Sequence, residues 1–295
     1  MDSPLSDVGN STQAFKAGMR AQWDSAAAGW NAHSADIRSW LHAPTETMCH
    51  LAGVRAGSRV LDVAAGAGDQ TVTIAQAVGA QGHVLATDLS PAIVALARDN
   101  AARAGLAHVE ARVADGEDLG VPEASFDAAV CRLGLMFFPD PLRGLREMHR
   151  ALRPGGRACT LVFSRAEKNP CLTILMSTAL KHAGLPPRDP LAAGGLLSLG
   201  QPGCIDALFT AAGFQDVVST EVDAVFHLPS VDHYLDFVRS SAGPVMQILG
   251  RLDAAATAAA WAEMRERLMV FTADGGWHGP NELLLTAGRR PKENP

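Results

Sequence analysis

Three acidic residues lie at or near the ends of apolar segments in the first half of the chain. Asp62 lies within VLDVAAGAGDQT, residues 60–71, Asp88 ends the apolar run in HVLATDLSP, and Asp115 ends the next run, just before Gly116. Segments rich in Val, Leu and Ala are typical of parallel strands buried on both faces. Because parallel strands end at one edge of a sheet, we expect these carboxylates at the edge where such folds bind ligands.

A Gly-x-Gly turn, Gly66 and Gly68, follows the first segment and would let the backbone approach a ligand closely. The pattern alone is weak evidence, because an ordinary strand-to-helix turn shares it. A dinucleotide-binding turn would have a third glycine where this chain has Thr71. In addition, every charged residue from Val60 to Ala95 is acidic. The turn therefore favours a ligand without phosphate over NAD.

S-adenosylmethionine fits this charge pattern, because it carries a sulfonium, an ammonium and one carboxylate but no phosphate. Asp62 is predicted to pair with the ammonium, since a lone buried carboxylate is costly; capping of backbone amides is the alternative. Asp88 is predicted to accept both ribose hydroxyls, with a helix cap as the alternative. Asp115 is predicted to bond the adenine amino group, whereas Glu117 and Asp118 are more typical of solvated loop acids.

Apolar segments alternate with helical patterns, and this alternation predicts an α/β fold with a mostly parallel sheet and helices on both faces. The expected strands are Arg59–Ala64, His83–Asp88, Val109–Asp115, Phe126–Leu133, Arg157–Phe163, Val217–Leu228 and Glu282–Gly288. The expected crossover helices are Thr71–Val78, Pro91–Ala104 with Ser90 as its N-cap, and Leu142–Leu152. One domain, residues 57–290, would contain these elements, followed by a polar tail at 291–295.

Three regions depart from the alternation and are predicted to form helical lids: residues 1–56, and insertions at about 165–200 and 230–278. Trp23 and Trp30 are seven residues apart, so they share one side of a helix and could close over cofactor and substrate. A buried docking helix is the alternative. A packed helix is expected from Ala254 to Met269, before a turn at residues 274–276.

The motifs VLDVAAGAGD, ATDLS, ADGEDL, FDAAVCRLGLMFFPD and LRPGGR, in this order, resemble those of class I S-adenosylmethionine-dependent methyltransferases. The sequence is most similar to small-molecule enzymes related to the ubiquinone/menaquinone-biosynthesis C-methyltransferases, over roughly residues 55–165, with 201–229 and 280–290 completing the sheet. The resemblance implies a Rossmann-like seven-stranded sheet that ends in an antiparallel pair. It implies that LRPGGR is a structural turn. It also implies cofactor contacts at Asp62, Ala64, Gly66, Gly68, Asp88, Leu89, Asp115, Gly116 and Arg132.

Arg132 follows the fourth strand and would face the methionine end of the cofactor, with a surface ion pair as the alternative. The apolar loop that follows, with Met136 and Phe137, is expected to line the substrate pocket beside Trp23 and Trp30, and core packing is its alternative.

These features predict methyl transfer from S-adenosylmethionine, with S-adenosylhomocysteine as product, to a small apolar or aromatic molecule, most readily at carbon or oxygen. N- or S-methylation, a cofactor-binding module without turnover, and an NAD-dependent oxidoreductase are the alternatives. If the acceptor loses a proton, histidine is the first candidate base. Spacing singles out none of the four candidates in the lids, which are His33, His42, His233 and His278.

The composition indicates which classes of binding partner and which cellular compartment to expect. The chain has 25 basic and 31 acidic residues, a formal net charge of −6, so it lacks the basic surface expected of a nucleic-acid binder. Its five cysteines show no CxxC pair, which predicts reduced thiols and no metal site. Neither a leader peptide nor a membrane span is indicated. We therefore expect a cytoplasmic protein with a small-molecule substrate, and the composition leaves a homo-oligomer open.

Overall fold

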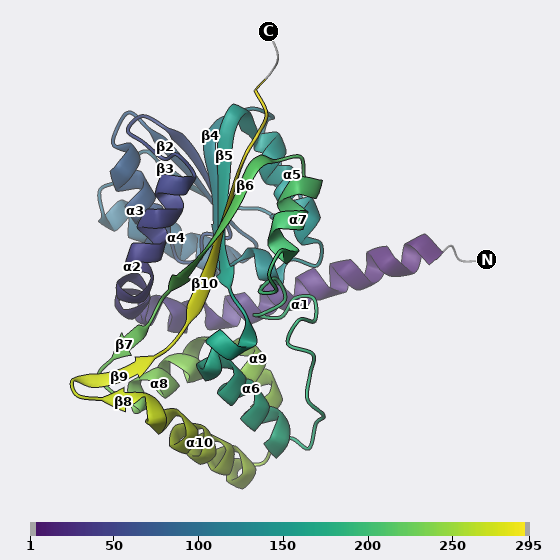
Figure 1. Ribbon diagram of the computed structural model, residues 1–295, viewed down its shortest axis with the longest axis vertical. Coiled ribbons are helices and arrows are strands. Elements are labelled where there is room, and N and C mark those ends of the chain that lie inside the picture. Colours follow the sequence, from purple (N-terminus) through teal and green to yellow (C-terminus); the bar gives the residue numbers. More distant parts are fainter. Residues whose placement is uncertain (1–3, 293–295) are drawn as a thin grey trace.

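The computed structural model describes residues 4–292, with side chains from Thr12 to Lys292. A seven-stranded sheet has the order β3-β2-β1-β4-β5-β10-β6 (Figure 1). Strands β1 to β5 pair in parallel, whereas β10 runs antiparallel to both β5 and β6. The predicted fold class is confirmed, including the antiparallel end of the sheet. The strands are β1 (Arg59–Val63), β2 (His83–Asp88), β3 (Val109–Val113), β4 (Phe126–Arg132), β5 (Leu152–Phe163), β6 (Gln215–Asp223) and β10 (Glu282–Arg289).

Helices cover both faces of this sheet. On one face lie α2 (Ser34–Leu51), α3 (Asp69–Val78) and α4 (Pro91–Arg103), and on the other α5 (Pro141–Ala151) and α7 (Cys204–Ala211) (Figure 1). The three crossover helices match their predicted bounds to within two residues. The predicted cap is confirmed, because Ser90 Oγ accepts the Ile93 N–H at 3.1 Å.

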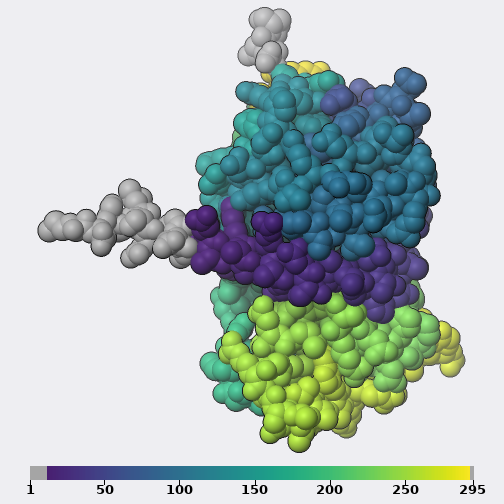
Figure 2. Space-filling model, turned by 180° about the vertical axis from the view of Figure 1, so that it is seen from behind, coloured from purple at the N-terminus to yellow at the C-terminus, as the bar shows by residue number. Residues whose placement is uncertain are grey.

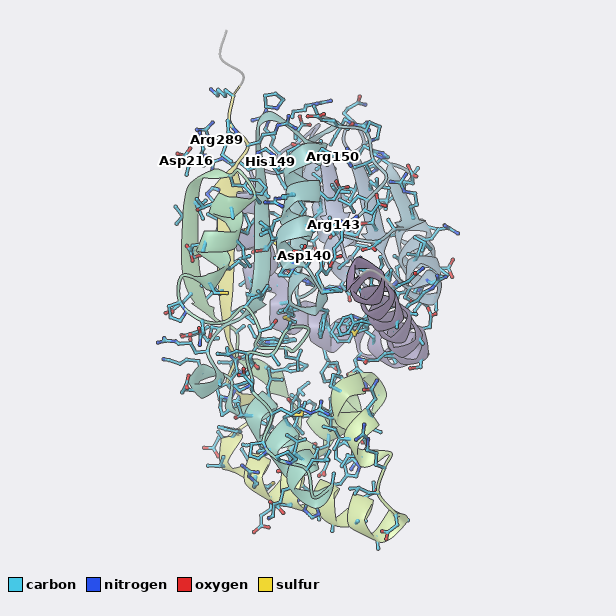
Figure 3. All side chains as sticks on the ribbon, turned by 90° about the vertical axis from the view of Figure 1, so that its right-hand side faces the viewer. Asp140, Arg143, His149, Arg150, Asp216 and Arg289 are labelled. Atoms are coloured by element: carbon cyan, nitrogen blue, oxygen red, sulfur yellow. The ribbon has the colours of Figure 1, made fainter. Side chains whose placement is uncertain are left out.

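The outer face of α5 and the far edge of the sheet carry charged side chains (Figure 3). Asp140 caps α5 by accepting the Arg143 N–H at 3.0 Å. Arg289 of β10 donates from Nε to Asp216 of β6 at 2.8 Å, which ties the two antiparallel strands together. Both contacts hold neighbouring elements of the fold together, so we regard both as structural.

A second, mostly helical part lies beyond the carboxyl ends of β1 to β5 (Figure 1). It contains a small sheet of order β7-β9-β8. Trp277 of this sheet is fully buried, stacks on Tyr234 at 4.3 Å between ring centroids, and donates from Nε1 to the Leu268 carbonyl at 2.9 Å. The elements are α6 (Pro170–His182), α8 (Val231–Ser241), α9 (Gly243–Leu249), α10 (Ala254–Leu268), β7 (Phe226–Leu228), β8 (Thr272–Ala273) and β9 (Gly276–Gly279).

The prediction of one strand over Val217–Leu228 is wrong. The segment forms two strands, since β6 pairs with β10 only as far as Asp223 and β7 joins the small sheet through β9. The segment that pairs with these two strands is also interrupted at this level, between β9 and β10. Pro280 lies there and has no N–H to donate to a strand ladder. The predicted turn at 274–276 falls inside a hairpin between β8 and β9, two strands that the sequence did not predict.

LRPGGR, predicted as a turn, is assigned to the start of β5, but its pairing with β4 is irregular. The register jumps from Phe126 opposite Leu152 to Ala128 opposite Arg157. Residues 153–156 therefore bulge from the ladder, and Gly155 has φ of +82°, a conformation that favours glycine.

The long first helix, α1 (Pro4–Ala32), lies between the two parts and contacts α4 on one side and α8 and α9 on the other. Figure 2 shows it crossing the back of the molecule along this boundary. Within residues 4–292, no helix combines the length and apolar character needed to cross a membrane.

Candidate active site

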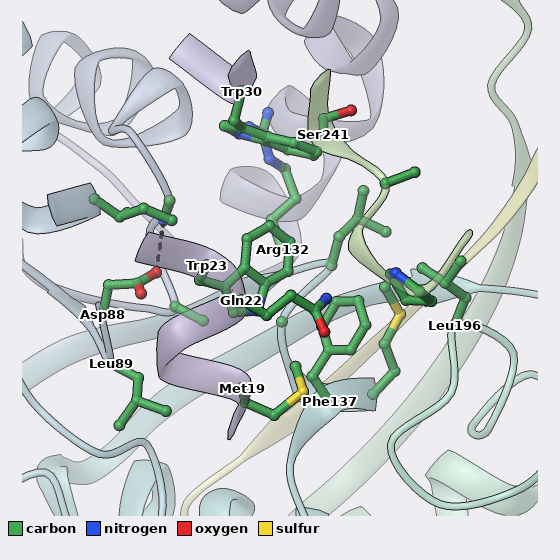
Figure 4. A pocket seen from close by; sticks show the side chains of 18 of the residues that line it. Met19, Gln22, Trp23, Trp30, Asp88, Leu89, Arg132, Phe137, Leu196 and Ser241 are labelled. Carbon is green, nitrogen blue, oxygen red and sulfur yellow. Dashed lines mark hydrogen bonds between the residues drawn. The ribbon is translucent and has the colours of Figure 1, made fainter. Parts of the chain in front are cut away.

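A cavity opens at the carboxyl ends of β1 to β4, where the sheet meets α1 and the helical part (Figure 4). Most residues predicted to bind cofactor or substrate line it, but Asp62 and Gly68 do not. The predicted residues in its wall are Ala64, Gly66, Asp88, Leu89, Asp115, Gly116, Arg132, Trp23, Trp30, Met136 and Phe137.

The backbone is strained where two adjacent strands end at the cavity. Ala64 follows β1 with φ of +53°, and Leu133 follows β4 with φ of +56°. Non-glycine residues seldom adopt this conformation, and such residues concentrate at functional sites. Gly134 packs against Ala64 so closely that a Cβ there would lie 2.4 Å from the Ala64 Cβ. These two turns therefore form a tightly packed floor to the cavity.

Gly66 and Gly68 have different structural roles. Gly66, with φ of +58°, lies in the wall, where a Cβ would come within 3.6 Å of Trp30 Nε1. Gly68 caps α3 with φ of +90°, and a Cβ there would lie 3.2 Å from the Ala97 backbone. The second glycine therefore allows α3 to pack against α4 and does not itself reach the cavity.

Asp62 is fully buried behind the wall. Its carboxylate accepts hydrogen bonds from Gln70 Nε2 and Thr71 Oγ1, both at 2.6 Å. Burial raises the pKa of Asp62 to about 6, although both hydrogen bonds and the nearby Arg132 act in the opposite direction. Both partners are side chains, so the backbone-cap alternative does not describe this geometry. Asp62 reaches the cavity through Gln70, which does line it.

Asp88 lies in the wall and also holds the turn beside it. Its two carboxylate oxygens accept the Gly66 N–H at 3.1 Å and the Ser90 N–H at 3.0 Å. Burial raises the pKa of Asp88 in spite of these hydrogen bonds. The predicted capping alternative is thus present, while the carboxylate remains at the surface of the cavity (Figure 4).

Two acids and one lysine meet at the end of β3. Lys16 of α1 places Nζ 2.6 Å from Asp115 Oδ2 and 2.6 Å from Glu117 Oε2. The expectation that Glu117 is a solvated loop acid is wrong: it is 2% exposed, lines the cavity and accepts the Asp140 N–H at 2.7 Å. Its partners are distant in sequence, so no local pattern separates Glu117 from Asp118.

Arg132 is buried in the wall at 9% exposure, so the surface ion pair considered from the sequence is ruled out. Its Nη1 donates to Thr45 Oγ1 at 3.0 Å. Burial lowers the pKa of Arg132, whereas the charges of Asp69 and Asp62 raise it. Asp69 itself pairs at 3.5 Å with the exposed Arg38, and its Oδ2 has no hydrogen-bond partner among residues 12–292. Arg132 is therefore a buried cation available to an anionic group in the cavity.

Aromatic side chains line the rest of the cavity. Trp23 packs edge-on against Trp30 and Phe137, with centroid distances of 5.9 and 5.5 Å. Trp40 of α2 stacks on Phe226 of β7 at 4.7 Å. The sequence prediction missed Trp40 and Phe226, and also Phe163, Tyr234 and Phe237, which line the same end. None of the charged residues in the described wall comes from α6, α8 or α9.

The candidate histidines do not reach the cavity, and no histidine in the described part of the chain lines it. His33 and His233 both contact Asp36, outside the wall. His42 is exposed and lies 3.6 Å from Glu46. His278 meets His227 in the small sheet.

Comparison with known proteins supports the sequence resemblance. Residues 37–180 match the model of the ubiE/COQ5 methyltransferase family. The ubiquinone/menaquinone biosynthesis C-methyltransferase UbiE of Marinomonas sp. (strain MWYL1) is 39% identical over 116 residues, which is 39% of this chain and 46% of the relative. The UbiE of Azotobacter vinelandii is 40% identical over 116 residues, again 39% of this chain and 46% of the relative. The chain thus spans about half the length of the curated relatives it matches.

Solved structures share the fold at lower identity. The YcgJ protein of Bacillus subtilis has a TM-score of 0.57 and 19% identity, covering 86% of this chain and 100% of that one. The [4+2]-cyclase SpnF has a TM-score of 0.55 and 20% identity, covering 92% and 97%. The name of the second protein shows that this fold alone does not decide the reaction. The strand order, the motifs and these matches show the fold of class I S-adenosylmethionine-dependent methyltransferases, and residues 37–180 of the chain are similar to the ubiE/COQ5 methyltransferase family.

Proposed function

We propose that this protein transfers a methyl group from S-adenosylmethionine to a small apolar or aromatic molecule, most readily at carbon. The observation that carries the proposal is a single cavity with two unlike ends. One end has carboxylates and a buried arginine at the edge of the sheet, and the other is aromatic. The similarity to a C-methyltransferase over 116 residues, within a chain whose residues 37–180 match the ubiE/COQ5 methyltransferase family, supports carbon as the methylated atom.

The charged residues fit a cofactor with one carboxylate and a net positive charge. Arg132, a buried cation, would hold the carboxylate. Gln70 gives its Nε2 to Asp62, so its carbonyl oxygen remains to accept from the ammonium. Asp88 would accept from the ribose hydroxyls, and Asp115 or Glu117 from the adenine amino group. When bound, S-adenosylmethionine supplies an electrophilic methyl group on its sulfonium.

The protein contributes mainly alignment and the exclusion of water. In methyl transfer the acceptor atom must approach to about 3–3.5 Å along the axis of the bond that breaks. Trp23, Trp30 and Phe137 pack edge-on between the two ends of the cavity and would keep water from this line. Because no histidine of the described chain lines the cavity, a proton released by the acceptor would go to a cavity carboxylate or to water.

We infer that α1 serves as the predicted lid. Three of its side chains bind the sheet domain: Lys16 pairs with Asp115, Asp24 accepts from Ser90 Oγ at 2.5 Å, and Asn31 accepts from Asn100 Nδ2 at 3.0 Å. These polar contacts can be exchanged for water when α1 lifts. Opening of α1 would admit the cofactor, and closure would return Trp23 and Trp30 to the cavity.

We also propose a cytoplasmic protein that acts without nucleic acid. All five cysteines are unpaired, which suits a reducing compartment, and the net charge of −6 does not favour a polyanion.

Calorimetric titration with S-adenosylhomocysteine, and separately with NADH, tests the cofactor. We expect saturable binding of S-adenosylhomocysteine and none of NADH, and the reverse result would overturn the proposal.

Incubating the protein with radiolabelled S-adenosylmethionine and small-molecule extracts tests the transfer. A labelled apolar product is expected. Tight cofactor binding without any labelled product would instead support a module that binds the cofactor without methyl transfer, as the fold shared with a cyclase allows.

A further inference from the structure

Two histidines and an aspartate meet outside the cavity, where the start of α2 faces α8. His33 is the N-cap of α2, Asp36 lies in its first turn, and His233 is near the start of α8. Asp36 Oδ2 lies 3.2 Å from His33 Nδ1 and 2.8 Å from His233 Nε2. One ligand atom from each residue lies within 4.8 Å of the other two. The group therefore converges on a single small volume.

These donors and distances suit a metal ion of the zinc class. Imidazole nitrogen and carboxylate oxygen bind zinc at about 2.0–2.2 Å, which in a tetrahedral site places the ligand atoms about 3.3–3.5 Å apart. The two distances to Asp36 are 3.2 and 2.8 Å, both shorter than that value, so the side chains would have to move apart by less than about 1 Å for an ion to enter. The side chains are 17%, 28% and 38% exposed, which leaves a route to solvent and room for water as a fourth ligand.

Among the described residues, Asp36 has no permanent cation beside it. Within residues 12–292, the ion pairs of Asp36 are with these two histidines and with no lysine or arginine. A divalent ion would therefore not compete with a lysine or an arginine for this carboxylate.

We propose that His33, Asp36 and His233 bind one divalent transition-metal ion, with zinc as the best fit, and that the ion clamps α2 to α8. The three residues do not line the cavity, so the ion would not touch the reacting atoms. It would act on the aromatic wall, because His33 packs edge-on against Phe237 at 5.4 Å and Phe237 lines the cavity. The cysteine spacing gave no sign of this site, which depends on residues about 200 positions apart. The inference does not rest on the proposed methyl transfer.

A zinc titration of the tag-free full-length chain, followed with a competing chromophoric chelator, tests the site. We expect one equivalent to bind, and His33→Gln and His233→Gln to weaken it at least tenfold, since even residues that only orient a ligand contribute about 10–100-fold. His42→Gln is the matched control, because His42 is on the same helix and pairs with Glu46 alone. Absence of saturable binding, or equal affinity in wild type and both ligand variants, would overturn the proposal. So would loss of binding only in His278→Gln, which would move the ion to the small sheet.

Thermal unfolding gives a second measurement that does not depend on activity. Ions that bind only the folded chain raise Tm with concentration. We expect zinc to raise the Tm of the wild type and of His42→Gln, but not that of Asp36→Asn, which keeps a hydrogen-bonding group and loses the charge. An equal rise in Asp36→Asn would show that the three residues are only a hydrogen-bonded cluster.

Discussion

The two ends of the cavity are built by different means. The acids and the arginine in the cavity wall come from one stretch of chain, residues 88–132, and each ends a strand or lies in the loop after one. The aromatic end is assembled from α1, α2, β5, β7 and α8, which are far apart in sequence. Backbone topology brings these charged groups to one edge of the sheet. The aromatic groups position one another, as the stack of Trp40 on Phe226 illustrates.

This difference has an energetic counterpart. At the sheet edge, burial raises the pKa values of Asp62 and Asp88, so these ionised carboxylates cost stability and are expected to matter through what they bind. At the aromatic end, rings lose their contact with water and gain contact with other rings, which stabilises the fold. We therefore expect the first end to control cofactor affinity and the second to control stability.

The largest effect should follow from Phe226→Ala. Phe226 is 2% exposed and contacts Trp40, Phe237 and Tyr234, so its loss should lower the free energy of unfolding by about 3–5 kcal/mol. Affinity for S-adenosylhomocysteine should change by less than about threefold, that is, by less than 0.7 kcal/mol. Urea unfolding and calorimetry measure the two quantities.

Phe226→Leu replaces the alanine variant if that variant does not fold. It should lower the free energy of unfolding by only about 1–2 kcal/mol. A tenfold loss of cofactor affinity in the leucine variant would contradict the expectation that the aromatic end controls stability and not cofactor affinity.

Arg132→Gln should have the next largest effect. Loss of a charge-assisted contact in a buried site should weaken S-adenosylhomocysteine about 100-fold, or about 2.7 kcal/mol. Arg38→Gln is the control, because Arg38 also lies beside Asp69 but is 58% exposed. Calorimetry on both variants measures the difference. Equal losses in the two would mean that Arg132 acts only through the charge of Asp69.

Asp88→Asn should weaken S-adenosylhomocysteine at least tenfold, or about 1.4 kcal/mol, because an amide is a poorer acceptor for two hydroxyls. Asp118→Asn changes an acid in the loop after β3 that does not line the cavity, and should leave the dissociation constant unchanged. An unaltered constant in Asp88→Asn would show that the ribose lies elsewhere.

The sequence is sufficient to predict the sheet domain because its information is local. Strand and helix bounds for β1 to β4 and α3 to α5 agree with the structure to within two residues. Asp88, Asp115 and Arg132 could be placed in the cavity wall, because a strand end fixes where the next side chain lies.

The remaining features depend on contacts between distant segments. Trp40 Nε1 donates to the Ala224 carbonyl, 184 residues away, at 2.7 Å, and nothing near Trp40 in the sequence indicates this partner. Glu117 differs from Asp118 only through Lys16 and Asp140, which fold onto it from elsewhere. Residues 215–228 are divided between two sheets at the level of Pro280, which follows them by more than 50 positions in the sequence.

Asp62 offers the subtlest test, because it serves the sheet edge without reaching the cavity. Its pKa of about 6 in the folded chain lies above the ordinary value of 3.8. Between these two pH values the folded chain binds a proton that the unfolded chain has lost, so the free energy of unfolding rises as the pH falls through this window. Asp62→Asn cannot take up this proton, and urea unfolding of both proteins near pH 4.5 and pH 7 measures the difference. Relative to the variant, the wild type should have a higher free energy of unfolding at pH 4.5 than at pH 7.

Asp69 and Asp88, whose pKa values are also raised, remain in both proteins, so their contributions largely cancel in the comparison. A difference that does not change with pH would mean that the hydrogen bonds from Gln70 and Thr71, together with the charge of Arg132, fully offset the burial of Asp62. In that case the sheet edge would hold its carboxylates without cost, and the energetic contrast with the aromatic end would lose its basis.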